Sequence, residues 1–256
     1  DKTGLDIRLH KVAEKEEQKV RAARLDPSLW TSDAQAVIHD PAIDILVEVI
    51  GGIEPARSFI LAGLKAGKAV VTANKALLAK HGQELFEAAL AARSSIGFEA
   101  SVCGGVPIIG AIRDGLVANR IESILGILNG TTNYILTRMM QSGVSYRQAL
   151  AEAQHNGYAE ADPTLDVKGL DAAHKLVLLS DLAFHSMFAL EDVYAEGIDD
   201  IRLDDARFAA ELGYTLKLLA IAKRQPSGDD SEDLPSGLEL RVHPTLIPHA
   251  HPLANV

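Results

Sequence analysis

The segment that decides the fold runs from residue 44 to residue 74 and reads DILVEVIGGIEPARSFILAGLKAGKAVVTAN. Two apolar stretches rich in β-branched residues, 44–50 and 68–74, flank a helical pattern over 54–67 that has a proline in its first turn. Strand, helix and strand in this order are typical of a parallel sheet. Polar and apolar residues do not alternate along the two strands, which indicates that both strands are buried. We therefore predict a parallel α/β sheet that is covered by helices on both faces.

The same alternation continues on both sides of this segment. A strand is predicted at 7–13, a helix at 75–92 and a further strand at 95–101. A dinucleotide-binding domain of this kind opens with a strand, a G-x-G-x-x-G turn and a helix whose N-terminus receives the pyrophosphate. The chain contains no such glycine pattern. We expect a chain that lacks the start of its nucleotide-binding domain and that also stops short at its other end; a different fold is the alternative.

After residue 101 the pattern changes to longer segments with few strands. The predicted elements are a glycine-rich loop leading into a helix at 103–119, a strand at 120–130, a helix opened by threonines at 131–143, a helix at 145–157, a loop at 158–168, helices at 169–184 and 206–224, a mobile polar loop at 225–237 and a strand at 238–247. This composition predicts an α+β domain. The expected fold is thus α/β, with a partial Rossmann-type nucleotide-binding domain at 1–98 followed by an α+β substrate domain at 99–256.

Composition and charge limit the classes of ligand. The 256 residues carry a net charge of −10 and no basic run, which argues against nucleic acid and in favour of a small molecule. No stretch approaches the roughly 20 apolar residues that cross a membrane, and no signal segment opens the chain. The single cysteine, Cys103, permits no internal disulfide, which fits a reducing cytoplasm, and a small buried side chain is a better interpretation of it than a nucleophile.

The segment GLDAAHKLVLLSDLAF, residues 169–184, places two charged residues on a helix that is otherwise nearly all apolar. At about 100° per residue, Asp171 and Lys175 fall within about 40° of each other, at the head of a stripe that Leu178 and Leu182 continue. A surface ion pair worth a few tenths of a kcal/mol is the simpler interpretation. A helix that is apolar nearly all round is usually buried, however, and charged groups in a dry setting collect at functional sites.

Polar residues also follow the two central strands of the first domain. Gly51 and Gly52 come directly after the strand at 44–50, where they allow a ligand close to the backbone or form a plain tight turn. Asn74 and Lys75 end the next strand, where a lysine can meet a phosphate, a carboxylate or a developing alkoxide; a surface lysine is the alternative. Ligands of open α/β sheets bind at this edge.

Two further segments lie in the second domain. ILNGTTNYI offers the N–H groups and hydroxyls of Gly130, Thr131 and Thr132 at a helix N-terminus, which suits a carboxylate or simply caps the helix. GYAEADPTLD presents three carboxylates beside a tyrosine; they would grip an ammonium ion or form a solvated acidic loop. Together the four segments outline a nucleotide-binding domain joined to a pocket for a small zwitterion.

Three segments resemble the signature segments of the homoserine dehydrogenase family: EASVCGGVPII at 99–109, GILNGTTNYIL at 126–136 and GYAEADPTLDVKGLDAAHK at 157–175. The resemblance implies an NAD(P)-dependent oxidoreductase that interconverts L-homoserine and L-aspartate 4-semialdehyde, in the branch of amino-acid biosynthesis that leads to threonine, isoleucine and methionine. It also implies a cytoplasmic homodimer whose second domain carries the homoserine site and the dimer contacts.

The resemblance assigns roles residue by residue. Lys175 becomes the acid/base at the reacting oxygen, with Asp171 as its partner. The expected substrate-binding residues are Glu160, which would bind the amino group, Asp166, Tyr158, Gly130, Thr131 and Lys75. The expected cofactor contacts are Gly51, Gly52, Asn74, Lys75 and Gly157. A structural sodium ion would be held, largely through backbone carbonyls, by Glu99, Val102, Gly104 and Val106.

Two questions follow from the resemblance. Glu14 would favour a coenzyme with a free 2′-hydroxyl, whereas Lys15 beside it could accept a 2′-phosphate, so we expect use of both NAD and NADP. Oxidation of homoserine also requires a neutral lysine to accept the hydroxyl proton, and desolvation favours that form. Asp171 opposes it, so we expect Asp171 to orient the amine or hold a water beside it.

The sequence leaves two alternatives open. One is a related dehydrogenase that acts on another small amino-acid aldehyde or alcohol. The other is an inactive or regulatory fragment that binds a small amino-acid ligand without turnover, because the glycine fingerprint of the family is absent.

Overall fold

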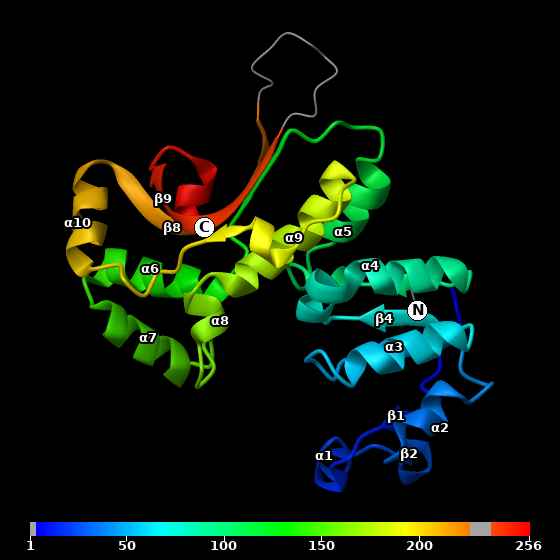
Figure 1. Cartoon of the computed structure of the whole chain (residues 1–256). Helices are drawn as coiled ribbons and strands as arrows, with labels where there is room; N and C mark the ends of the chain where they lie inside the picture. Colours follow the sequence, from blue (N-terminus) through cyan, green and yellow to red (C-terminus); the bar gives the residue numbers. More distant parts are fainter. Residues whose placement is uncertain (1–3, 226–236) are drawn as a thin grey trace. The chain divides into compact units, whose positions relative to one another are not determined.

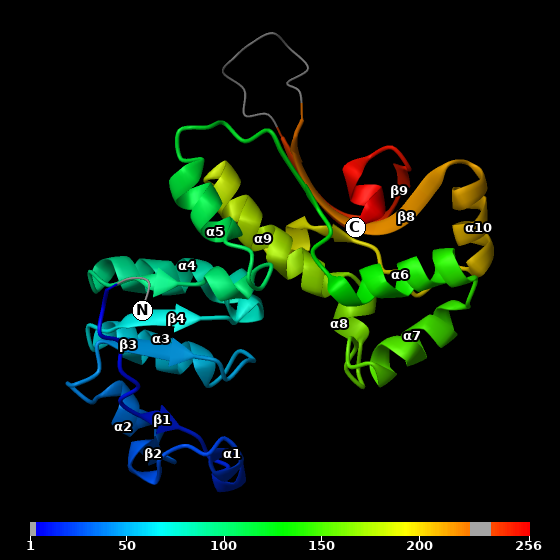
Figure 2. The ribbon, with the colours of Figure 1, turned by 180° about the vertical axis from the view of Figure 1, so that it is seen from behind.

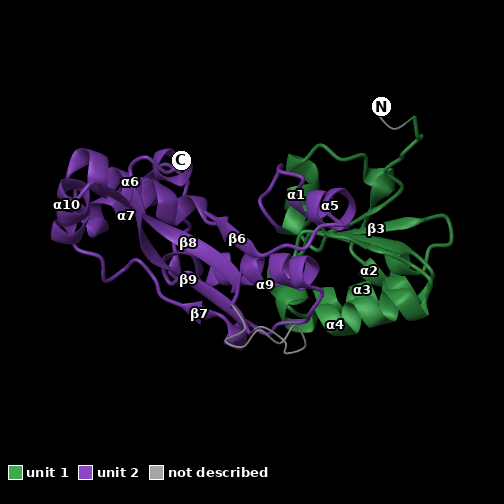
Figure 3. Ribbon diagram, turned by 90° about the horizontal axis from the view of Figure 1, so that it is seen from above, with its two compact units in different colours: residues 1–101 green, residues 102–256 purple. Residues whose placement is uncertain are grey.

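Strand β3 (Ile45–Glu48), helix α3 (Ala56–Lys65) and strand β4 (Ala69–Thr72) form the strand–helix–strand unit that the sequence predicts. The computed structural model describes residues 4–225 and 237–256, so residues 226–236 of the predicted mobile loop lie outside the described residues. The chain divides into two units, residues 1–101 and 102–256, which Figure 3 draws in separate colours.

Unit 1 contains two parallel sheets. Strands β3, β4 and β5 (Ile96–Gly97) lie in the order β3-β4-β5, and β1 (Val12–Ala13) pairs with β2 (Trp30–Thr31). The predicted strand at 7–13 is therefore confined to its last two residues. Besides α3, the helices of the unit are α1 (Glu17–Ala22), α2 (Ala34–Ile38) and α4 (Lys75–Ala91).

The prediction that both faces of this sheet are covered is wrong for the described residues. Helices α3 and α4 pack side by side on one face (Figure 3), because right-handed crossovers between successive neighbouring strands deliver their helices to the same side. Gly63 of α3 approaches Leu46 on that side. On the other side Ile45 and Val47 are 50% and 60% exposed, so β3 is not the fully buried strand that its sequence suggests.

Unit 2 is built on a mixed sheet of four strands. The strands β6 (Ser123–Gly126), β8 (Tyr214–Arg224), β9 (Leu238–Pro248) and β7 (Tyr194–Ala195) lie in that order, and β7 pairs with β9 in parallel while the other pairs are antiparallel. Strands β8 and β9 run together over eleven residue pairs and form the long curved ribbon of Figures 1 and 2. This unit confirms the α+β prediction.

Helices α6 (Gly130–Ser142), α9 (Leu170–Phe184) and α10 (Leu203–Glu211) pack against β8. Helix α7 (Tyr146–His155) packs on α6, and a short helix, α8 (Thr164–Val167), precedes α9 within the predicted loop at 158–168. The predicted helix at 103–119 is reduced to α5 (Ile108–Gly110) and a π-helical turn. Among the described residues no helix combines the length and the apolar character needed to cross a membrane.

The predicted helix at 206–224 is wrong. Helix α10 ends at Glu211, Gly213 takes a left-handed conformation with φ +83°, and the chain continues as β8. All seven residues from Leu216 to Ala222 are buried, because the middle of β8 is covered on both faces. A strand buried on both faces loses the polar and apolar alternation that would have distinguished it from a buried helix.

Gly197, just after β7, allows α8 to pack closely against the sheet. A Cβ atom at this position would lie 2.4 Å from the carbonyl oxygen of Val167 and 2.8 Å from the Cα atom of Lys168. Both neighbours are backbone atoms and cannot rotate away. Since α8 carries Asp166, this contact fixes the height of that side chain above the sheet.

We predict that Gly197→Ala lowers the unfolding free energy by about 1–3 kcal/mol, the usual cost of overpacking, measured by urea denaturation followed by circular dichroism. Gly115→Ala is the matched control, because its Cβ would meet no atom within 4 Å. Equal stability of the two variants would contradict the close packing of α8.

Candidate active site

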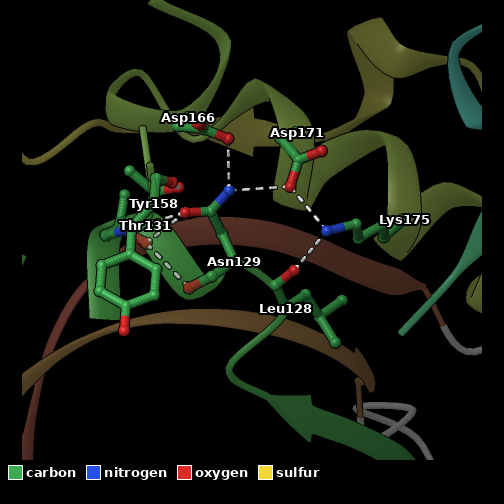
Figure 4. A network of polar contacts seen from close by, with 8 residues as sticks. Leu128, Asn129, Thr131, Tyr158, Asp166, Asp171 and Lys175 are labelled. Atoms are coloured by element: carbon green, nitrogen blue, oxygen red, sulfur yellow. Dashed lines mark hydrogen bonds and ion pairs between the residues drawn. The ribbon is translucent and has the colours of Figure 1, made fainter. Parts of the chain in front are cut away.

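Helix α9 begins after Gly169, which has φ +77°, and carries Asp171 in its first turn and Lys175 one turn later. The Nζ atom of Lys175 lies 2.7 Å from Oδ2 of Asp171, and the two side chains are only 17% and 10% exposed (Figure 4). The pair is therefore largely buried, which excludes the interpretation as a solvated surface ion pair.

Lys175 has a second acceptor, which comes from a distant part of the chain. Its Nζ atom donates to the carbonyl oxygen of Leu128 at 2.7 Å, in the turn between β6 and α6. An ammonium group has three donors. Among the described residues, hydrogen bonds to protein acceptors account for two of them.

The cap of α6 differs from the sequence prediction. The predicted capping threonines are Thr131 and Thr132, but the side chain of Asn129 accepts the N–H of Thr132 at 2.8 Å and is the actual cap. Asn129 also donates to Asp166 and Asp171, as Figure 4 shows. This residue is absent from the site residues that the sequence predicts. Asparagine is among the most favoured N-cap residues, and that signal could have found it.

The loop before α9 contributes its predicted residues unequally. Thr131 donates its hydroxyl to the carbonyl oxygen of Tyr158 at 2.7 Å, which ties the start of α6 to the loop. Asp166 joins the network through Asn129, whereas Glu160 is exposed. Asp162 instead accepts the N–H and the hydroxyl of Thr164, the first residue of α8, and these donors hold the pKa of its carboxyl below the usual range.

Cys103 lies in the same unit at a left-handed backbone position, with φ +58°. Burial raises the pKa of its thiol, and the positive charge of Lys175 acts in the opposite direction. Cys103 is half-buried rather than fully buried as predicted, and a raised pKa argues against a nucleophile.

Unit 1 brings its predicted residues to the carboxyl ends of β3 and β4. Gly51 and Gly52 have φ +80° and +71°, and a Cβ on either would meet no atom within 4 Å. The buried carboxylate of Glu48 accepts the N–H groups of Ile50 and Gly51, at 2.7 and 3.1 Å. The amide of Asn74 donates to the carbonyl oxygen of Gly52 at 2.7 Å. The turn is therefore fixed, and its backbone is open to a ligand.

Asn74 has a second role, because its side-chain oxygen caps α4 through the N–H of Leu77. Lys75 is the first residue of that helix. The predicted metal-binding residues are Glu99, Val102, Gly104 and Val106. A tight turn lies among them, in which the N–H of Val106 donates to the carbonyl oxygen of Cys103. A sodium ion there stays a prediction.

Comparison with known proteins identifies the family. A family model described as homoserine dehydrogenase matches residues 107–256, and one described as the NAD-binding domain of homoserine dehydrogenase matches residues 1–99. The chain belongs to the homoserine dehydrogenase family. The resemblance found in the sequence and the predicted fold class, a partial Rossmann-type domain followed by an α+β domain, are thereby confirmed.

Individual homoserine dehydrogenases are similar over most of this chain. That of Corynebacterium glutamicum is 50% identical over 230 residues, which is 90% of this chain and 51% of the relative. That of Helicobacter pylori is 45% identical over 256 residues, all of this chain and 58% of the relative. The chain thus spans little more than half the length of these curated homoserine dehydrogenases.

Solved homoserine dehydrogenases share the fold. A crystal structure from Thiobacillus denitrificans has 50% sequence identity and a TM-score of 0.89 and covers 96% of this chain, which matches 55% of that one. A hyperthermophilic archaeal homoserine dehydrogenase in complex with NADPH has 27% identity and a TM-score of 0.74, with 93% of this chain and 68% of that chain covered.

At the other end of α9, burial raises the pKa of Asp181 to about 6, although the N–H of Phe188 donates to this carboxylate and acts in the opposite direction. The carboxyl group of Asp181 therefore binds its proton more tightly in the folded protein than in the unfolded chain. The stability that this proton contributes is present at low pH and is lost as the pH rises from about 4 through about 6.

Asp181→Asn keeps the acceptor for Phe188 and removes the titration. We predict that, relative to wild type, its unfolding free energy rises by about 1–2 kcal/mol between pH 4 and pH 7, after allowance for partial solvent screening. Urea denaturation at each pH measures this difference. Asp204→Asn on the exposed face of α10 is the control, and a pH-independent difference for Asp181→Asn would contradict the assignment.

Proposed function

We propose that the protein interconverts L-homoserine and L-aspartate 4-semialdehyde with NAD or NADP as coenzyme, in the branch that leads to threonine, isoleucine and methionine. The observation that carries this proposal is the buried pair of Lys175 and Asp171 on α9, in a chain of the homoserine dehydrogenase family. A buried lysine with one donor position left for a ligand is suited to proton transfer at a substrate hydroxyl.

Lys175 is the acid/base in this proposal. A neutral amine has two N–H donors and one lone pair, so it can satisfy the carbonyl of Leu128 and the carboxylate of Asp171 and still accept a proton from the substrate. In the oxidative direction the hydroxyl proton passes to Nζ of Lys175. In the reductive direction the ammonium form returns it to the carbonyl oxygen. In both forms Nζ donates to the carbonyl oxygen of Leu128 and to the carboxylate of Asp171. Only the third position on the nitrogen changes, from a lone pair that accepts to an N–H that donates.

Asp171 orients the amine. Its direct contact with Nζ, at 2.7 Å, supports this role over that of holding an intervening water. The carboxylate thereby holds the Nζ atom in a fixed position against the carbonyl oxygen of Leu128.

The substrate site is proposed to lie around the start of α6 and the loop before α9. Glu160 and Asp166 would bind the ammonium group of homoserine, and Gly130, Thr131 and Tyr158 would line the pocket. The hydrogen bond from Thr131 to Tyr158 supports this arrangement because it holds the helix start and the loop together. Lys75 would act from the first unit.

The residues of unit 1 fit a dinucleotide. Gly51 and Gly52 leave their backbone open, and Glu48 and Asn74 fix the turn that contains them. Gly51, Gly52, Asn74, Lys75 and, from unit 2, Gly157 are the proposed contacts. When bound, NAD(P) supplies the acceptor or donor of hydride. Glu14, which follows β1 directly, would bind the free 2′-hydroxyl of NAD, and Lys15 the 2′-phosphate of NADP.

Three further properties belong to the same proposal: a homodimer, a cytoplasmic location and a structural sodium ion at Glu99, Val102, Gly104 and Val106. The net charge of −10 supports a small-molecule substrate over nucleic acid. No feature of the described residues favours the alternative of an inactive fragment that binds an amino acid without turnover.

Lys175→Ala tests the proton transfer. We expect kcat for homoserine oxidation to fall by about 100- to 10,000-fold, the range for loss of a general acid/base, with a much smaller change in KM. The reaction is followed by the absorbance of the reduced nicotinamide, in the protein with any sequence that it carries beyond residues 1–256. Lys223→Ala, an exposed position on β8, is the control. A nearly normal kcat for Lys175→Ala would rule out this role.

Glu160→Ala tests recognition of the amino group. We expect KM for homoserine to rise by at least about 10-fold with a smaller change in kcat, because a charge-assisted contact worth about 1.5–3 kcal/mol is lost. Steady-state kinetics with homoserine and with an analogue that lacks the amino group measure the effect. Equal losses for both substrates would contradict the assignment.

A further inference from the structure

Asn129 connects the two carboxylates of the candidate site through a single amide. Its Nδ2 atom lies 2.7 Å from Oδ1 of Asp166 and 2.8 Å from Oδ2 of Asp171. Its oxygen accepts the N–H and the hydroxyl of Thr132, at 2.8 and 2.9 Å. The side chain is 4% exposed, so these contacts are protected from water. Figure 4 shows the amide of Asn129 between Asp166 and Asp171.

The chemistry of the neighbours fixes which way this amide points. The reversed orientation would place the amide oxygen against two carboxylates and the NH₂ group against the N–H of Thr132. Both would be repulsive contacts between groups of the same kind. In the orientation found, both N–H bonds and both lone pairs of the amide oxygen have partners. Asn129 is therefore held without rotational freedom.

The amide of Asn129 also reduces the electrostatic repulsion between two carboxylates. Asp166 and Asp171 repel each other, and each gains from a donor, but a second cation would compete with the substrate ammonium for Asp166. A neutral NH₂ group holds both carboxylates and adds no charge. With Lys175 protonated, the cluster retains one net negative charge, which suits binding of a cationic amino group.

We propose that Asn129 is a positioning residue that sets the carboxylate of Asp166 and the pair of Asp171 and Lys175 at a fixed separation. The proposal rests on the proposed function. Leu128, the residue immediately before it, gives its carbonyl oxygen to Lys175. Residues 128 and 129 thus orient Lys175 from two directions, one directly and the other through Asp171. Loss of the amide donors would disturb substrate binding and proton transfer together.

Asn129→Asp is the decisive variant. Aspartate has nearly the same shape and is an equally good N-cap, so the bond to Thr132 and the start of α6 are retained. The NH₂ donor becomes an acceptor that faces two carboxylates. We expect kcat to fall by about 100-fold, as for a catalytic group displaced by about 1 Å, and KM for homoserine to rise in the same variant. Asn129→Ser, which also caps but donates to neither aspartate in this geometry, is expected to lower kcat/KM in the same direction and covers the case in which Asn129→Asp does not fold.

The control is Asn119→Asp, which adds the same charge at an exposed position of the same unit and is expected to leave the kinetics unchanged. If Asn129 only caps α6, the Asp and Ser variants will both show wild-type kcat and KM. That result would overturn the proposal.

A second measurement does not depend on turnover. Competitive acetylation with acetic anhydride, followed by peptide mass spectrometry, reports the reactivity of Lys175 relative to the exposed Lys223. We expect the acetylation rate of Lys175 relative to Lys223 to differ from wild type in Asn129→Asp, because Asp171, which holds the amine, loses its amide donor. An unchanged ratio would overturn the positioning role. Failure of the wild-type protein to oxidise homoserine would instead refute the proposed function and leave the acetylation test valid.

Discussion

The burial of Asp171 and Lys175 at the head of α9 is the constraint on which the candidate site depends. An ion pair taken out of water is stable only when its remaining donors and acceptors also find partners. Lys175 finds the carbonyl of Leu128, and Asp171 finds the amide of Asn129. The turn between β6 and α6 must therefore lie against α9. Asp166 is added through the same amide, which brings α8 into the arrangement.

In unit 1, too, a buried carboxylate holds a turn at the end of a strand. The buried carboxylate of Glu48 accepts two backbone N–H groups of the turn after β3 and the hydroxyl of Thr72 from β4. Asn74 then holds the turn from the next strand end. In both units a buried carboxylate and an asparagine N-cap fix a short turn at the end of a strand. The turns differ in what they offer, since one exposes backbone at two glycines and the other orients a lysine.

The sequence predicted elements well where their patterns were local. The helix of α9 has an apolar pattern and a glycine before it, and both are visible in the sequence. The prediction from sequence was wrong where a helix and a strand share one pattern. The apolar run from Tyr214 to Arg224 suits a buried helix as well as a strand that is covered on both faces. The exposure of Val47 was also missed, because an apolar strand sequence does not say on which side the crossover helices will lie.

The sequence by itself determined the order of the elements, the family and the residue types available for chemistry, because these depend on local periodicity and on motifs that stand together in the chain. It also placed Asp171 and Lys175 one helical turn apart, since helix geometry alone sets that spacing. Only the tertiary structure decided that Leu128 and Asn129 complete this pair from a position more than forty residues earlier. Such contacts follow from the packing of α6 against the sheet and of α9 beside it, and no local pattern encodes which backbone carbonyl will meet a buried amine.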